Sequence, residues 1–188
     1  MKSPEQAKSS SNSLLSNTKS ADLPLIQSDT SGASTPFQLG QIFANRYCIK
    51  ELIGAGTSGT VYIAFDQTDN KDIALKILLP ELSSSEGFLD EVRLAKTLAH
   101  PSIVNVFDVQ SDGRGDQAQW FVTMELLKGQ NLRSFLISHE DNLTLVNIDE
   151  TLAIVAKLCD ALKYAHGKTV HCNIKPENIF LTESGDIK

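Results

Sequence analysis

The stretch from Arg46 to Leu79 restricts the fold of this chain more than any other part of it. Its sequence, RYCIKELIGAGTSGTVYIAFDQTDNKDIALKILL, consists of apolar and β-branched runs separated by turn residues at 54–59 and 66–72. Such runs are typical of consecutive strands joined by short turns. The stretch therefore predicts a three-stranded antiparallel meander.

One helix and two more strands are expected after the meander. Ser83 and Glu86 have the spacing of a capping box, and apolar residues then recur at helical period up to His100. Two apolar runs, IVNVFDV and WFVTMELL, have the pattern of strands. An α+β fold is thus predicted, beginning with a five-stranded antiparallel sheet and one helix. Residues 132–139 indicate a short helix, and residues 149–166 a longer one with an apolar stripe.

Composition and charge exclude several classes of protein. The chain has 188 residues, 41% of them hydrophobic, and a net charge of −6, which gives no general attraction to nucleic acid or to an anionic membrane. The three cysteines are scattered, so we expect no zinc site and a reducing, cytoplasmic compartment. No apolar run reaches the roughly 18 residues of a membrane helix, and the N-terminus lacks the pattern of a signal peptide.

The N-terminal part differs in texture from the rest of the chain. Residues 1–35 contain ten serines and three threonines but no aromatic residue. Such a composition buries too little apolar surface to offset the conformational entropy of the chain. We therefore expect residues 1–44 to be a disordered tail, which is either a solvated spacer or a carrier of phosphorylation sites.

The glycine run GAGTSG, Gly54 to Gly59, has three interpretations, and the residues after it decide among them. A dinucleotide-binding loop would open a helix, but the next residues, TVYIAF, indicate a strand. A Walker loop would end in lysine and serine or threonine, and Thr60-Val61 stands there instead. The third interpretation is a glycine turn between strands, which is either a plain hairpin or a flap whose backbone N–H groups approach a phosphate.

A lysine in the third strand favours the phosphate flap. Lys76 lies within the apolar run IALKILL, where an unpaired charge would be costly to bury, so it needs an anionic partner or ligand. Glu91, on the following helix, is the candidate partner. The alternative is that Lys76 extends its ammonium group to an edge and Glu91 faces solvent.

Taken in order, these motifs closely resemble those of a protein kinase, specifically the serine/threonine type widespread in bacteria. The resemblance implies a kinase small lobe at residues 45–127 and the start of a helical large lobe at 128–188. It rests on the glycine run with Thr60-Val61, Ala74-Leu75-Lys76, Phe88 to Glu91, His100-Pro101, Met124 to Leu127 and His171 to Asn178.

The resemblance also implies an ATP site. Lys76 would hold the α- and β-phosphates and pair with Glu91, and the backbone of Glu125 and Leu127 would meet the adenine edge. The implied nucleotide-binding residues are Ile53, Gly54, Ala55, Gly56, Thr57, Ser58, Gly59, Val61, Ala74, Lys76, Glu91, Met124 as gatekeeper, Glu125, Leu127 and Phe180. The sequence explains the apolar members Val61, Ala74 and Phe180 equally well as ordinary core.

The catalytic loop departs from the pattern of the family. The motif His-Arg-Asp, followed after four residues by Asn, is replaced here by His171-Cys172-Asn173 and then Asn178. Asn173 stands at the position of the catalytic base, and its amide cannot take a proton at neutral pH. Cys172 replaces the arginine that would pair with a phosphorylated activation loop. Lys175, two residues after the base, is typical of the serine/threonine branch.

The resemblance leaves three functional alternatives. The chain stops at Lys188, before the Asp-Phe-Gly of the family, so Asn178 is the only implied Mg²⁺ ligand and Mg²⁺ binding is expected to be weak or absent. The chain is accordingly an ATP-binding kinase fragment with impaired catalysis, a non-catalytic pseudokinase interaction module, or an inactive split-gene remnant. The helix at 149–166 is expected to expose part of its apolar stripe, to which a protein partner could bind.

Overall fold

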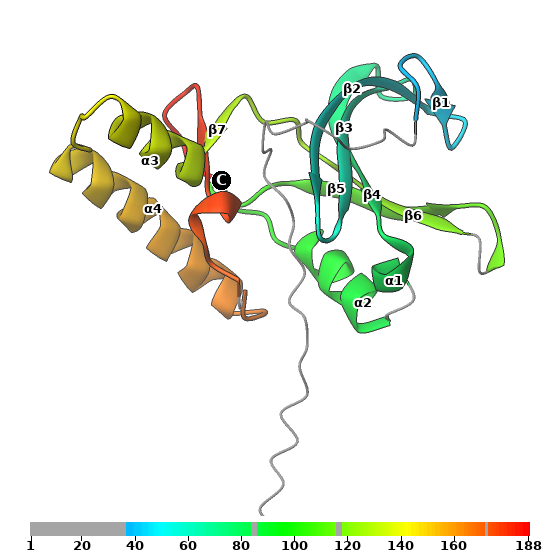
Figure 1. Cartoon of the computed structure of the whole chain (residues 1–188). Helices are drawn as coiled ribbons and strands as arrows, with labels where there is room; N and C mark the ends of the chain where they lie inside the picture. The colour runs from blue at the N-terminus through cyan, green and yellow to red at the C-terminus, as the bar shows by residue number, and fades with distance from the viewer. Residues whose placement is uncertain (1–36, 84–85, 116–117, 172) are drawn as a thin grey trace, which may run out of the picture.

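The computed structural model describes residues 37–83, 86–115, 118–171 and 173–188. Its larger sheet is antiparallel and six-stranded (Figure 1). In spatial order its strands are β1 (Ile42–Phe43), β2 (Tyr47–Gly56), β3 (Gly59–Asp66), β4 (Lys71–Leu78), β6 (Gln119–Met124) and β5 (Val106–Asp112). The predicted meander is β2-β3-β4, and the two further strands are β5 and β6. The structure thus confirms the five predicted strands and adds the two-residue strand β1.

Helix α2 (Glu86–Ala95) covers one face of this sheet, below the strands in Figure 1. Its Leu89 and Val92 are buried in a cluster with Val61, Ala74 and Val106 of the sheet. The single turn α1 (Pro80–Ser83) precedes α2. The predicted capping box at Ser83 and Glu86 brackets residues 84 and 85, which lie outside the described residues.

The opposite face of the sheet is covered by residues that the sequence pattern assigns to the tail. Phe43 of β1 is buried, and its ring packs edge-to-face on Phe121, with ring centroids 5.0 Å apart. Phe37 packs in the same way on Phe43 and on Tyr62. The tail boundary at residue 44 is therefore wrong, because aromatic residues from 37 onward bury apolar surface that the serine-rich segment lacks. Residues 1–36 lie outside the described part of the chain.

The second half of the chain combines two helices with a small sheet. Helix α3 (Leu132–Asp141) is capped by Asn131, whose Oδ1 accepts the Ser134 N–H at 2.7 Å. Helix α4 spans Ile148–His166, and the 3₁₀ turn η2 spans Pro176–Asn178. Strands β7 (Gly129–Asn131) and β8 (Phe180–Thr182) pair antiparallel. Both predicted helices are confirmed.

Helix α4 buries only a part of its apolar stripe. Ala161 and Ala165 are buried, whereas Leu152 and Val155 are 61% and 47% exposed. The expected exposure of this stripe is therefore confirmed. Within the described residues, no helix is long and apolar enough to cross a membrane.

The first half of the molecule, which ends with β6, contacts the second half, which begins with β7, near the C-terminus of α4. The Tyr164 hydroxyl accepts a hydrogen bond from the Ala99 N–H at 3.1 Å, and the Lys168 ammonium donates to the Thr97 carbonyl at 2.9 Å. The His100 Nδ1 accepts from the Ser102 N–H, so its Nε2 carries a proton and donates to Asp160 at 3.2 Å. These contacts fix the segment after α2 to α4.

A bidentate ion pair connects the start of β2 to the end of β3. Arg46 Nε and Nη2 donate to the two oxygens of Asp66 at 2.7 and 2.8 Å, and the N–H groups of Thr68 and Asp69 also donate to Asp66. Asp66 is almost fully buried. Its hydrogen bonds to Arg46 hold the pKa of the carboxyl group below its usual value.

We predict that Asp66→Asn lowers the free energy of unfolding at pH 7 by about 1–3 kcal/mol. The pKa of Asp66 is lowered by folding, so its stabilisation is present above pH about 4 and is lost as pH falls through the folded pKa. Urea unfolding of both proteins at pH 7 and pH 3 measures this. As the control, Asp72→Asn removes the exposed pair with Lys50 and should change stability by less than about 0.5 kcal/mol. Equal losses for the two variants would contradict the prediction.

Candidate functional site

The glycine run forms a hairpin turn between two strands. Gly56 and Gly59 are paired across the β2-β3 ladder, and Thr57-Ser58 is the two-residue turn. Gly59 has φ of +145°, and a Cβ atom placed on it would lie 2.0 Å from the Ile77 carbonyl oxygen of β4. Glycine is required there for both reasons. The prediction that a strand, and not a helix, comes after the loop is confirmed.

Lys76 lies under this hairpin with its whole side chain buried. It is paired with Val61 in the β3-β4 ladder and is 0% exposed. Its Nζ donates a hydrogen bond of 2.8 Å to Ser58 Oγ, from the turn of the glycine hairpin. The structure therefore brings the glycine-run residue Ser58 and the lysine into direct contact.

The predicted pair of Lys76 with Glu91 is not present. Glu91 is exposed, and no ion pair within the described residues joins it to Lys76. The apolar face of α2, with Leu89 and Val92, faces the sheet and leaves Glu91 in solvent. The alternative in which Glu91 faces solvent is the correct one, whereas Lys76 does not reach an edge.

The buried apolar side chains among the implied nucleotide-binding residues fall into two groups. Ile53, Val61, Ala74 and Met124 belong to one core cluster, in which Ala74 is directly opposite Met124 on the neighbouring strand. Phe180 is fully buried but lies in the separate two-stranded sheet. The four small-lobe residues are thus brought together, and Phe180 belongs to the other half of the molecule.

The segment joining the two halves leaves a backbone edge open. The Glu125 N–H donates to the Asn105 carbonyl at 2.9 Å. Within the described residues, the Glu125 carbonyl and the Leu127 N–H take part in no backbone hydrogen bond. One acceptor and one donor two residues apart are what an adenine edge needs.

Side chains hold this segment in place. Glu125 Oε1 accepts from the Asn105 N–H at 2.7 Å and pairs with Lys188 Nζ at 2.6 Å. Both charged side chains are largely withdrawn from water. Sequence reasoning missed the supporting roles of Asn105 and Lys188, because no local pattern links residues so distant in the chain.

Side chains of the catalytic loop form hydrogen bonds with the backbone of Asn173. The Asn173 N–H donates to His171 Nδ1 at 3.2 Å, and Asn178 Nδ2 donates to the Asn173 carbonyl at 3.0 Å. His171 is exposed as a whole, but partial desolvation of its ring and the nearby His166 lower its pKa. The ring is therefore neutral at pH 7 and accepts the Asn173 N–H. Lys175 precedes η2, which carries Asn178.

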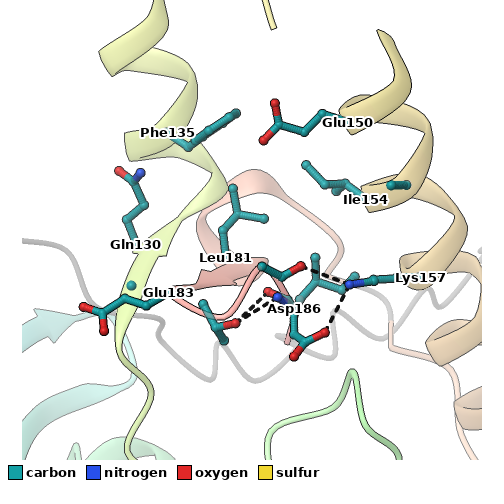
Figure 2. Close-up of a pocket in the computed structure, with 13 residues that line it drawn as sticks. Gln130, Phe135, Glu150, Ile154, Lys157, Leu181, Glu183 and Asp186 are labelled. Carbon is teal, nitrogen blue, oxygen red and sulfur yellow. Dashed lines mark hydrogen bonds and ion pairs between the residues drawn. The ribbon is translucent and has the colours of Figure 1, made fainter. Parts of the chain in front are cut away.

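Two cavities lie away from Lys76 and the glycine hairpin. One, of about 550 Å³, lies between α3, α4 and β8 and is lined by Phe135, Ile154 and Leu181, with Lys157 bound to Asp186 (Figure 2). The other, of about 820 Å³, borders the open backbone edge, because Glu125, Leu127 and Lys188 line it. Neither is lined by Lys76, so the candidate site rests on the lysine and the open backbone edge.

Comparison with known proteins agrees with this geometry. The family model of the protein kinase domain matches residues 47–188. The chain belongs to the protein kinase family. Its relatives include a probable serine/threonine-protein kinase of Clostridium acetobutylicum, 34% identical over 80% of this chain and 22% of that protein. The serine/threonine-protein kinase PknD of Chlamydia trachomatis serovar D is 34% identical over 76% of this chain and 16% of its own length.

A solved kinase has the same fold. The crystal structure of the Mycobacterium tuberculosis PknI kinase domain matches with a TM-score of 0.66 and 25% identity, over 80% of this chain and 60% of that one. The predicted α+β kinase-like fold is thereby confirmed. The chain spans less than a quarter of the Clostridium and Chlamydia relatives.

We predict that Gly59→Ala destabilises the small lobe by about 2–4 kcal/mol, because the new Cβ would meet the Ile77 carbonyl and φ is positive. Gly56→Ala is the matched control, since a Cβ there has no neighbour within 4 Å, and its effect should stay within about 1 kcal/mol. Thermal and urea unfolding measure both variants. Similar stabilities for the two would show that the hairpin does not approach β4 this closely.

Proposed function

We propose that this serine/threonine kinase-type chain binds ATP and transfers phosphate poorly by itself. The observation that supports binding best is the open carbonyl of Glu125 and N–H of Leu127, beside a lobe that buries Lys76 beneath a glycine hairpin. The backbone edge would pair with adenine, and the lysine would meet the α- and β-phosphates. Gly54 to Gly59 would cover the phosphates with backbone N–H groups.

The proposed impairment rests on Asn173. Its backbone N–H and carbonyl are engaged within the catalytic loop, so its side chain occupies the place of the family's base without altering the loop. A carboxamide can orient a substrate hydroxyl through its oxygen, but it cannot accept the proton. Loss of a general base typically lowers a rate by about 10²–10⁴.

We also propose that this chain binds Mg²⁺ only weakly. Asn178 is the metal ligand implied within this chain, and its Nδ2 already donates to the Asn173 carbonyl, which leaves Oδ1 for a cation. A neutral amide without a carboxylate binds Mg²⁺ poorly. Within the described residues, no three histidine, cysteine or acidic side chains gather to hold a metal ion.

A second candidate function is protein binding through α4. Leu152 and Val155 are exposed along one side of this helix, and Ile148 at its start is also exposed. Contiguous apolar residues on a surface are typical of interaction sites. The chain would then act as an interaction module, with or without nucleotide.

We expect the chain to bind ATP weakly, with an affinity that changes by less than about threefold when Mg²⁺ is added. Lys76→Met should weaken binding by about tenfold or more, because a charge-assisted contact to phosphate is lost. Lys71→Met is the matched control, an exposed lysine at the start of the same strand, and should leave the affinity unchanged. Calorimetric titration measures these affinities. A large increase with Mg²⁺ would contradict the proposed metal site, and no binding at all would contradict the proposed function.

We also expect Asn173→Asp alone to give no measurable phosphotransfer in the 188-residue chain. Phosphoryl transfer depends mainly on positioning and on metal ions that neutralise charge, and a restored base supplies neither. The same substitution in a chain extended by Asp-Phe-Gly and the rest of a large lobe should phosphorylate serine or threonine. The unmodified chain and the extended chain with Asn173 are the controls in a radiolabelled phosphate assay. Clear activity of the unmodified 188 residues would overturn the proposed impairment.

A further inference from the structure

We propose that Ser58 limits nucleotide affinity by holding the Lys76 ammonium group when no nucleotide is bound. This inference rests on the proposed function, since the phosphates of a nucleotide are the ligand that would displace the serine. It goes beyond that function because it assigns Ser58 a side-chain role. The family pattern implied only that its backbone lies near phosphate.

The contact is buried and its geometry is good. Ser58 and Lys76 are 3% and 0% exposed, and Nζ lies 2.8 Å from Oγ. The serine therefore accepts a hydrogen bond from a cation that water does not reach. Ser58 Oγ is one partner of Lys76, and it belongs to the same hairpin that would cover the phosphates.

The turn is fastened to β4 at two further points. The Ser58 carbonyl accepts from the Leu79 N–H at 3.3 Å, just beyond the end of β4. Gly59 lies so close to Ile77 that a side chain would not fit between them. The turn thus lies directly over Lys76, and a phosphate group would have to part Ser58 from Lys76 to reach the ammonium.

The electrostatics determine which partner Lys76 prefers. A neutral hydroxyl oxygen compensates a buried cation less well than an anion does. Glu91, the carboxylate expected to share this lysine, is exposed and does not pair with it. Because phosphate oxygens carry negative charge, they would replace the Ser58 hydroxyl, but at the cost of the hydrogen bond already made. Removing the hydroxyl removes this competition.

Ser58→Ala should therefore bind ATP and ADP roughly three- to tenfold more tightly than the unmodified chain, which matches the net contribution of a typical hydrogen bond that no longer has to be broken. Adenosine has no phosphate, so its affinity should not change. Thr60→Val is the matched control, because it removes a hydroxyl from the same hairpin at a position with no assigned role in nucleotide binding. It should alter none of the three affinities. Calorimetric titration of each variant gives the ratios.

A second measurement tests the contact without nucleotide. Acetylation of Lys76 by acetic anhydride, followed by peptide mass spectrometry, should be faster in Ser58→Ala than in the unmodified chain or in Thr60→Val, because the amine loses a partner. If Ser58→Ala fails to fold by circular dichroism, Ser58→Cys, a weaker acceptor of similar size, takes its place with the same expectations.

The outcomes separate this inference from the proposed function. If the unmodified chain binds nucleotide and Ser58→Ala binds it equally or less tightly, the inference is wrong and the proposed function stands. An equal gain for adenosine would also overturn the inference, because phosphate would not be the competing group. If no variant binds nucleotide, the proposed function fails. In that case an unchanged acetylation rate would also rule out the contact between Ser58 and Lys76.

Discussion

The rest of this structure depends on one buried cation in the middle of a β-sheet. Lys76 is fully buried in β4, between neighbours that are almost all apolar, and such a charge is tolerated only with polar partners. The glycine hairpin provides one of them, since Ser58 approaches the ammonium at 2.8 Å. That approach is possible only because Gly59 has no side chain to separate the hairpin from β4. The charge, the glycine and the hairpin thus form one unit.

A second constraint fixes the segment between β6 and β7, to which the edge of an adenine ring would bind. The backbone of Glu125 is bound to Asn105, and its carboxylate joins Asn105 of the first half to Lys188 of the second. Regions far apart in the sequence therefore determine the course of the short segment between β6 and β7. The contacts of Tyr164 and Lys168 with the segment after α2 add a second attachment between the halves. Together they keep the open backbone edge at a defined place between the two halves.

The sequence predicted the features that depend on local pattern and missed those that depend on tertiary packing. Alternating apolar residues and glycine turns were enough for β2 to β6, and helical periodicity for α3 and α4. Strand β1 has two residues, too few to show a period, and its identity depends on Phe43 packing against Phe121. The direction of Glu91 was missed for the same reason, because the rotation of α2 is set by Leu89 and Val92 against the sheet.

The loop containing Asn173 shows why family membership and activity can separate. Two hydrogen bonds in this loop use the main chain of Asn173: its N–H donates to His171, and its carbonyl accepts from Asn178. A carboxylate and a carboxamide are nearly equal in size, so either side chain fits this backbone. Proton acceptance, however, belongs to the side chain alone. Under the proposed impairment, the fold and the nucleotide-facing lobe would stay intact while proton acceptance at this position is lost, and the fold alone does not establish catalysis.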